Sequence, residues 1–121
     1  MRIFVTKAFA RFADRVGIDD AQLRVSIERV EQGAVVVDLG GGDAELRLAR
    51  RGRGKSGSFR SIVLLRRGDR AFFVYGFAKN ERDDIRPDEL KAFRKLADTM
   101  SALDERQLEA AKRKGAIREI G

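Results

Sequence analysis

The spacing of apolar residues changes twice along the chain, and this change constrains the fold more than any other feature. Apolar positions recur at helical intervals up to residue 33 and again after residue 87. Between them lie β-branched runs and segments with period-two alternation. Helices that precede and follow a block of strands predict an α+β domain, with helices packed against a mostly antiparallel, twisted sheet.

The first part of the chain predicts one strand and two helices. Residues 2–6 form a short apolar strand, and Thr6 is placed to cap a helix that ends at Gly17. Asp19 is placed to cap a second helix, which ends at Gly33. Because the two helices are joined by a tight turn, they are expected to form an αα-hairpin.

The middle of the chain predicts four strands. They are expected from residue 34 to the glycines at 40–42, then at 45–49, 59–67 and 71–77. Gly68 and Asp69 form the turn of the last hairpin, whose two strands are apolar enough to lie centrally. Residues 50–58 are predicted to form a loop.

The last part of the chain predicts two more helices. Pro87 suits the first turn of one helix, and Asp104 is placed to cap the next, which Gly115 ends. Residues 117–120 are interpreted either as a short strand or as a strip that binds a partner. The predicted order is therefore β-α-α-β-β-β-β-α-α, within a single domain over residues 1–121. The expected core includes two groups of aromatic and apolar residues, namely Phe9 and Phe12 with Phe72, Phe73 and Val74, and the stripe of Leu90, Phe93 and Leu96.

The composition limits both the ligands this protein is expected to bind and the side chains that could transfer protons. A net charge of +7 and a pI of about 10.4 are typical of proteins that bind polyanions such as nucleic acid. The sequence has no cysteine and no histidine, so proton transfer has to use Lys, Arg, Tyr, Asp, Glu, Ser or backbone groups. We expect no metal and no cofactor. Since no long apolar run is present, we also expect no membrane contact and a cytoplasmic protein.

Positive charge gathers in the strand region. Nine basic residues and a single acid, Asp69, lie between Arg47 and Arg70. Glycines at 52, 54 and 57 permit close backbone approach to a ligand, and the cations around them favour a phosphate chain. The Walker A spacing is not met, because position 49 is Ala. The alternative is an ordinary solvated loop. The candidate phosphate-binding residues here are Arg50, Arg51, Arg53, Lys55, Ser56 and Gly57.

A second group of candidates follows the last strand. Tyr75 and Phe77 are candidates for stacking on a base, and Arg60 and Lys79 for holding a scissile phosphate. Asn80 and Arg82 complete the group. Two alternatives stay open at this point. Phe77 belongs to the core, or the basic residues at 79 and 82 simply pair with the acids at 81 and 83.

Four segments of the chain resemble the HigB-like toxins of the RelE/ParE superfamily. They are residues 7–13, 39–42, 48–57 (LARRGRGKSG, leading to Arg60) and 75–83 (YGFAKNERD). The similarity covers essentially the whole chain. The sequence departs from the best-known RelE pattern at Asn80, where that pattern has Arg, and at about Arg86, where a Tyr is common. Both departures fit the HigB-like branch better.

The resemblance implies the toxin of a type II toxin–antitoxin system. Such toxins enter the ribosomal A site and cut messenger RNA without a metal, by attack of a ribose 2′-OH on the adjacent phosphate. A separate antitoxin, often with a helix-turn-helix domain, neutralises them. By position, Lys55, Arg60 and Lys79 match the basic residues of the family site. Arg60 is then the phosphate clamp, and Lys55 or Lys79 the general base or acid.

Two other functions remain possible from the sequence. A ParE-like member of the same superfamily would inhibit DNA gyrase without nuclease chemistry. A plain nucleic-acid-binding module would bind without a chemical step, and substitutions at Lys55 and Arg60 would then weaken binding in a salt-dependent way. Because the basic residues of the family site are retained, the ribosome-dependent endoribonuclease is the favoured interpretation.

Overall fold

Local capping explains where the first two helices begin and end in the computed structural model. The structure describes residues 1–33, 37–40, 43–48, 59–66, 69–78 and 85–120. The Thr6 side chain accepts a hydrogen bond from Phe9 N, and Gly17 ends the helix with φ 79°. Asp19 and Gln22 form a reciprocal capping box at the second helix. Both predicted helix starts are confirmed.

The described residues contain six strands and four helices, in the order expected from the sequence with one strand added at the end. They are β1 (Arg2–Thr6), α1 (Lys7–Val16), α2 (Asp20–Glu31), β2 (Val37–Gly40), β3 (Asp43–Leu48), β4 (Phe59–Arg66), β5 (Arg70–Ala78), α3 (Pro87–Ser101), α4 (Glu105–Arg113) and β6 (Ile117–Ile120). The predicted residues 34–36 and the predicted loop at 50–58 lie outside the described part of the chain.

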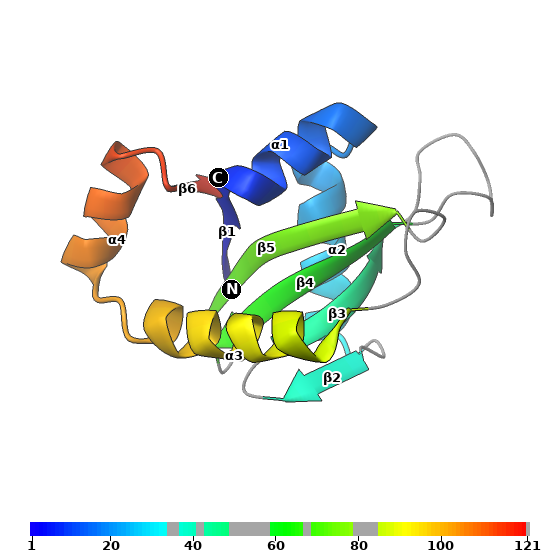
Figure 1. The fold of residues 1–121 in the computed structure, drawn as a ribbon. Coiled ribbons are helices and arrows are strands. Elements are labelled where there is room, and N and C mark those ends of the chain that lie inside the picture. Colours follow the sequence, from blue (N-terminus) through cyan, green and yellow to red (C-terminus); the bar gives the residue numbers. More distant parts are fainter. Residues whose placement is uncertain (34–36, 41–42, 49–58, 67–68, 79–84, 121) are drawn as a thin grey trace.

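The strands form one sheet with the order β2-β3-β4-β5-β1-β6, shown in Figure 1. All neighbouring pairs are antiparallel except β1 and β5, which run parallel. The sheet carries α1 and α2 on one face and α3 on the other (Figure 1). This arrangement confirms the predicted α+β fold, with its mostly antiparallel sheet packed against helices.

Two apolar clusters fill the space between the sheet and its helices. Phe9 and Phe12 of α1 pack together with Phe73 of β5, and all three side chains are at most 5% exposed. Phe72 and Val74 lie on the opposite face, under α3 and α4. Partly buried side chains of α3, Phe93 and Leu96 among them, pack against this second cluster. Phe9, Phe12, Phe72, Phe73 and Val74 are therefore confirmed as core, whereas Phe93 and Leu96 only pack partly buried against it and Leu90 belongs to neither cluster.

The tail at Ile117–Ile120 is a strand. It pairs antiparallel with β1, with Ile120 opposite Ile3 and Ile117 opposite Thr6. Because β6 is the last strand in the sheet order, its outer side is an edge of the sheet. Among the described residues, no helix is both long and apolar enough to cross a membrane.

A β-bulge in β5 changes the face on which the end of that strand presents its side chains. Val63 is opposite Phe73 and Ile62 is opposite Tyr75, so Val74 is an extra residue on β5. Strict alternation would have placed Tyr75 with Phe73, on the α1 face. With the bulge, Tyr75 packs against the second cluster, on the α3 face. Gly76 instead faces α1, where an added Cβ would meet the Phe12 ring at 2.3 Å.

Candidate functional site

Three strands meet in register at one end of the sheet. Leu48 at the end of β3 lies opposite Phe59 at the start of β4, and Phe59 lies opposite Ala78 at the end of β5. Residues 49–58 connect the first two of these positions, and residues 79–84 follow the third. The predicted basic loop and the segment that contains Lys79 therefore both attach at this end. The predicted site residues that lie outside the described part of the chain are Arg50, Arg51, Arg53, Lys55, Ser56, Gly57, Lys79, Asn80 and Arg82.

Arg60 lies at this sheet end, on the second residue of β4. Its Cα is opposite Arg47 on β3 and Phe77 on β5, so the three side chains share the α3 face of the sheet. The Arg60 Nε atom is 3.6 Å from Glu45 Oε1, and the two side chains are only 13% and 12% exposed. The arginine is thus a largely buried cation at the end of the sheet to which residues 49–58 and 79–84 connect.

Arg47 and Arg60 place two positive charges directly across from each other. Like charges at opposed positions of neighbouring strands destabilise a sheet. Such a pair is suited to an anion that bridges or approaches both side chains. Glu45 and Arg47 were not among the predicted site residues. In the sequence, Glu45 and Arg47 alternate with Leu46 and Leu48, so the two charged residues share the other face of the strand. Only the pairing of β3 with β4 connects them to Arg60.

The two predicted stacking residues lie beside Arg60 on the same face. The Tyr75 ring is half-buried, with its centroid 5.6 Å from the Phe93 ring and 6.1 Å from the Phe77 ring. Phe77 is only 3% exposed. Tyr75 therefore has more ring surface available for stacking than Phe77. A base-stacking role for either ring stays a prediction.

Arg86, at the position where the RelE pattern often has Tyr, begins helix α3. Its backbone N donates to Glu89 Oε1 at 3.0 Å, and its side-chain Nε donates to Asp88 Oδ1 at 3.2 Å. Both contacts are local to the first turn of α3. In this structure Arg86 therefore serves the start of the helix.

Asp43, at the start of β3, is a buried carboxyl group on the same face as Glu45. It is 1% exposed, and neither of its oxygens has a hydrogen-bond partner among the described residues. Burial raises the pKa of Asp43 to about 6, an effect that the positive charge of Arg94 reduces and the negative charge of Asp98 increases. Arg94 itself donates to the Leu39 carbonyl, at 2.7 Å from Nη2. The buried acid thus lies where α3 crosses the β2–β3 hairpin.

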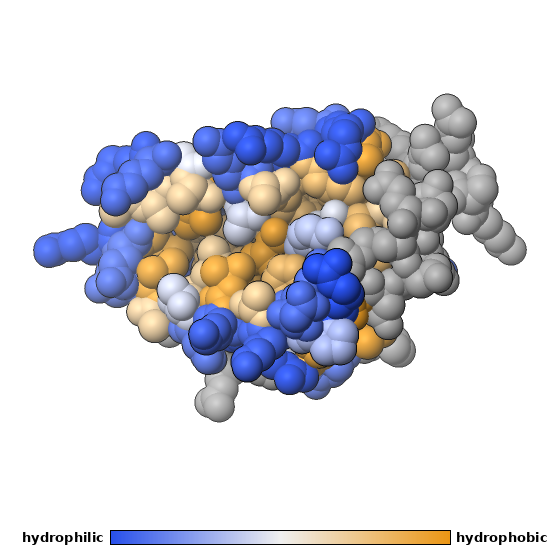
Figure 2. Space-filling view, in the orientation of Figure 1, coloured by the Kyte–Doolittle hydropathy of each residue, from blue (hydrophilic) through white to orange (hydrophobic). Residues whose placement is uncertain are grey.

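The face of the molecule in Figure 2 is largely apolar between α1, α3 and α4, with hydrophilic residues around it. The partly buried apolar residues of the second cluster on α3 and after it include Phe93, Leu96 and Leu103. An apolar surface of this kind does not attract a phosphate chain. The charged sheet end at Arg60 is chemically the better place for one.

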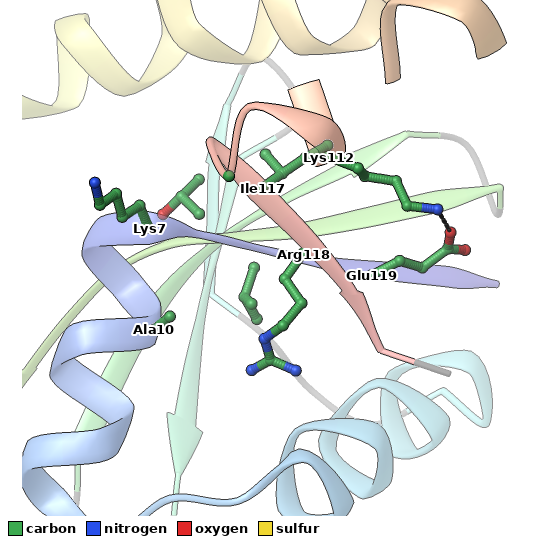
Figure 3. A pocket seen from close by; sticks show the side chains of 9 residues that line it. Lys7, Ala10, Lys112, Ile117, Arg118 and Glu119 are labelled. Carbon is green, nitrogen blue, oxygen red and sulfur yellow. Dashed lines mark hydrogen bonds and ion pairs between the residues drawn. The ribbon is translucent and has the colours of Figure 1, made fainter. Parts of the chain in front are cut away.

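A pocket of about 470 Å³ lies at the β1–β6 edge of the sheet, between α1, β1 and β6. Figure 3 shows Lys7, Lys112 and Arg118 among its lining residues. Two of these cations already have carboxylate partners, since Lys112 Nζ is 3.0 Å from Glu119 Oε1 and Arg118 Nη1 is 2.7 Å from Asp20 Oδ2. The charges here serve ion pairs within the fold, so this pocket is a weaker candidate for a polyanion.

Comparison with known proteins gives one family. No curated protein matches the chain. The family described as "RelE toxin of RelE / RelB toxin-antitoxin system" matches residues 1–120. This match spans nearly the whole chain and agrees with the strand and helix order described above. The chain belongs to the RelE toxin family of the RelE/RelB toxin–antitoxin systems.

Proposed function

We propose that this RelE-family toxin, of the HigB-like branch, is a ribosome-dependent endoribonuclease that cuts messenger RNA and so inhibits translation. One observation carries the proposal. Arg60 is a largely buried cation on the α3 face, opposite Arg47 and Phe77 and one row from Tyr75, at the sheet end to which the basic loop and the Lys79 segment connect. A fixed cation next to an aromatic ring suits an RNA phosphate and its neighbouring base.

The proposed reaction needs only the groups of this chain and the RNA. The ribose 2′-oxygen forms a bond to the adjacent phosphorus while the bond from phosphorus to the 5′-oxygen breaks. A base takes the 2′-OH proton, and an acid gives a proton to the leaving 5′-oxygen. The products are a 2′,3′-cyclic phosphate and a 5′-OH end. No metal or cofactor takes part in this scheme.

The side chains divide between charge stabilisation and proton transfer. Arg60 holds the non-bridging phosphate oxygens, whose negative charge grows in the transition state. Lys55 and Lys79 are the candidates for base and acid, because nearby cations favour the neutral form of a lysine. Tyr75 and Phe77 make weaker contacts, with the RNA bases. The remaining candidates bind the RNA chain, namely Arg50, Arg51, Arg53, Ser56, Gly57, Asn80 and Arg82.

The proposed partners are the ribosome with its bound message and a cognate antitoxin. Family membership supports the antitoxin, because the RelE/RelB system is a toxin–antitoxin pair. We expect a small antitoxin with a helix-turn-helix domain, and action in the cytoplasm, where ribosomes translate.

The experiment that tests the function compares three chains induced alone in bacteria. They are the wild type, Arg60→Ala and the control Arg113→Ala, which removes the same charge from an exposed position on α4. New 5′ ends are mapped over translated and untranslated regions of messages. The wild type and the control are expected to arrest growth and cut translated regions. With Arg60→Ala the cuts should fall by about 100-fold or more, because a transition-state donor is lost.

Other outcomes would replace the proposal. Arrested growth with intact messages would favour inhibition of gyrase, which a loss of the enzyme's ability to supercoil relaxed DNA would reveal. Binding to RNA that Arg60→Ala weakens in a salt-dependent way, without any cut, would favour a non-catalytic binding module.

A further inference from the structure

Glu45 is a largely buried acid beside two arginines, Arg47 and Arg60, and its place there needs an explanation. It lies on β3 opposite Ile62, which is in turn opposite Tyr75. The next row toward the sheet end holds Arg47, Arg60 and Phe77. Glu45 is thus the diagonal neighbour of Arg60, on the same face. A carboxylate in this position repels an RNA phosphate, so it would weaken RNA binding unless it does something else for the site.

The ion pair with Arg60 shows what Glu45 does. Its Oε1 atom is 3.6 Å from Arg60 Nε, which is the nitrogen nearest the aliphatic stem of the side chain. The two Nη groups of a guanidinium lie at the far end and form the fork that binds phosphate in a bidentate way. A carboxylate near Nε therefore attracts the guanidinium without occupying the whole fork.

Burial makes this attraction effective. The Arg60 and Glu45 side chains are 13% and 12% exposed, so water and salt screen the pair poorly. A free arginine side chain has many rotamers and loses that freedom when it binds a ligand. If the side chain is already held, less freedom is lost when RNA arrives, and the cation meets the transition state in one orientation.

We propose that Glu45 is the positioning residue of the site. It holds the Arg60 guanidinium on the α3 face of the sheet, and it acts through Arg60 rather than by touching RNA. The proposal deepens the function proposed above and rests on it, because the phosphate is what Arg60 is held for.

The first test measures the Arg60 side chain directly and needs no activity. In a ¹⁵N–¹H spectrum of the whole protein, Arg60 is expected to give a separate Nε–Hε signal, assigned by its loss in Arg60→Lys. In Glu45→Ala this signal should move into the group of solvent-exposed arginines, and in Glu45→Gln it should move only part of the way. Glu109→Gln, at an exposed acid on α4, serves as the control and should leave the signal in place. An Arg60 signal that Glu45→Ala does not move would overturn the proposal.

The second test measures cleavage by the purified protein on programmed ribosomes, in single turnover. Glu45→Ala is expected to lower the cleavage rate constant by about tenfold to a hundredfold, as a misplaced catalytic group does. The half-saturating ribosome concentration should stay the same or fall, because a repelling charge has been removed. Glu45→Gln should recover part of the rate. A Glu45→Ala rate equal to or above the wild-type rate would contradict the proposal.

The two tests separate the failure of this proposal from the failure of the proposed function. If the wild type does not cut RNA, the proposed function fails, while the spectrum still decides whether Glu45 holds Arg60. If Glu45→Ala does not fold, as judged by its thermal unfolding curve, the isosteric Glu45→Gln carries both tests. A Glu45→Gln signal and rate identical to those of the wild type would then count against a role for the charge.

Discussion

Two of the arginine–carboxylate pairs in this fold differ in geometry. At the sheet end, the Arg60 Nε atom is 3.6 Å from Glu45 Oε1, and Arg60 stands opposite Arg47. At the β1–β6 edge, Arg2 donates to both oxygens of Glu119, at 2.8 Å from Nε and 3.0 Å from Nη2. In both pairs the arginine stands opposite another arginine, since Arg2 is opposite Arg70, but the second pair is bidentate and its distances are shorter.

The β1–β6 edge contains further ion pairs around Arg2. Glu105 accepts from Arg2 and from Arg70, and Lys112 donates to Glu119 at 3.0 Å. Arg70 also donates to the Leu103 carbonyl at 2.6 Å and is 5% exposed. These contacts join β1, β5, β6 and α4. Charges at this edge are therefore balanced against each other, and they connect parts of the chain that are far apart in sequence.

The difference teaches how to tell a structural arginine from a functional one. A structural arginine has its donors matched by carboxylates and carbonyls of the protein itself. Arg60 instead has its Nε atom 3.6 Å from Glu45 Oε1, a longer contact than the hydrogen bonds of Arg2 and Arg70. Exposure does not separate the two groups, because Arg60 and Arg70 are both largely buried. Among the described residues, the length and geometry of these contacts separate them.

The largest expected effect comes from replacing one arginine of each kind with alanine. Arg60→Ala should lower single-turnover cleavage by about 100- to 1,000-fold, because it removes a donor that stabilises the transition state. Its midpoint of thermal unfolding should change by only a few degrees. Arg2→Ala should do the reverse, with a lower midpoint and nearly normal cleavage per folded molecule. Equal losses of stability and activity in both variants would contradict the distinction between the two arginines.

Asp43 provides a buried carboxylate with no hydrogen-bond partner among the described residues, so its pKa effect should have the opposite sign to that of a paired acid. Its folded pKa of about 6 lies above the ordinary 3.8, so the folded state binds more protons than the unfolded state between these values. Stability should therefore fall as pH rises from about 4 to about 6, by at most about 3 kcal/mol. Asp43→Asn should remove this loss and be more stable than the wild type at pH 7. Urea unfolding at pH 4.5 and pH 7 measures it, and equal pH slopes for the two chains would refute the expectation.

Arg70→Met tests whether the β1–β6 edge is structural. The change leaves the Leu103 carbonyl without its side-chain donor and takes a cation from Glu105. We expect a loss of about 2 kcal/mol in the free energy of unfolding, below the usual figure for a buried pair because Glu105 is mostly exposed. Urea unfolding with a cleavage assay on the same preparation measures both quantities. Cleavage that falls further than the folded fraction would place Arg70 in the site as well.

Glu119→Gln gives the smallest expected effect and sharpens the comparison through pH. Hydrogen bonds from Arg2 and then Lys112 lower the pKa of Glu119 from 4.5 to about 2. The pair therefore stabilises the fold above about pH 4.5, and this contribution is lost as pH falls toward 2. Because the side chain is partly exposed, we expect the variant to lose about 1 kcal/mol at pH 7. The wild type and the variant should approach equal stability near pH 2, which unfolding curves at both pH values would check.

Local signals in the sequence predicted most of the fold. Thr6, Asp19 and Asp104 all cap the helices they were expected to cap, because a cap depends on residues within three positions of it. The predicted strands at 45–49, 59–67 and 71–77 correspond to β3, β4 and β5 within one or two residues at each end that the structure describes. Period-two alternation predicted these strands, but it did not predict which strands are neighbours.

The candidate site was predicted only in part. Arg60 was a candidate from the sequence, and the structure puts it on one face with Tyr75 and Phe77. The sequence could not show that Tyr75 faces α3, because the bulge at Val74 reverses the simple alternation. Glu45 was missed for the same kind of reason. Its relation to Arg60, fifteen positions later, exists only once β3 and β4 are paired.

The sequence by itself determined the order of helices and strands, the helix boundaries, the family resemblance and the concentration of positive charge, because each depends on nearby residues or on composition. The tertiary structure decided the parallel pairing of β1 with β5, the addition of β6 at the edge and the contact between Glu45 and Arg60. These features depend on strand register, which side chains distant in sequence set together when they pack into one core.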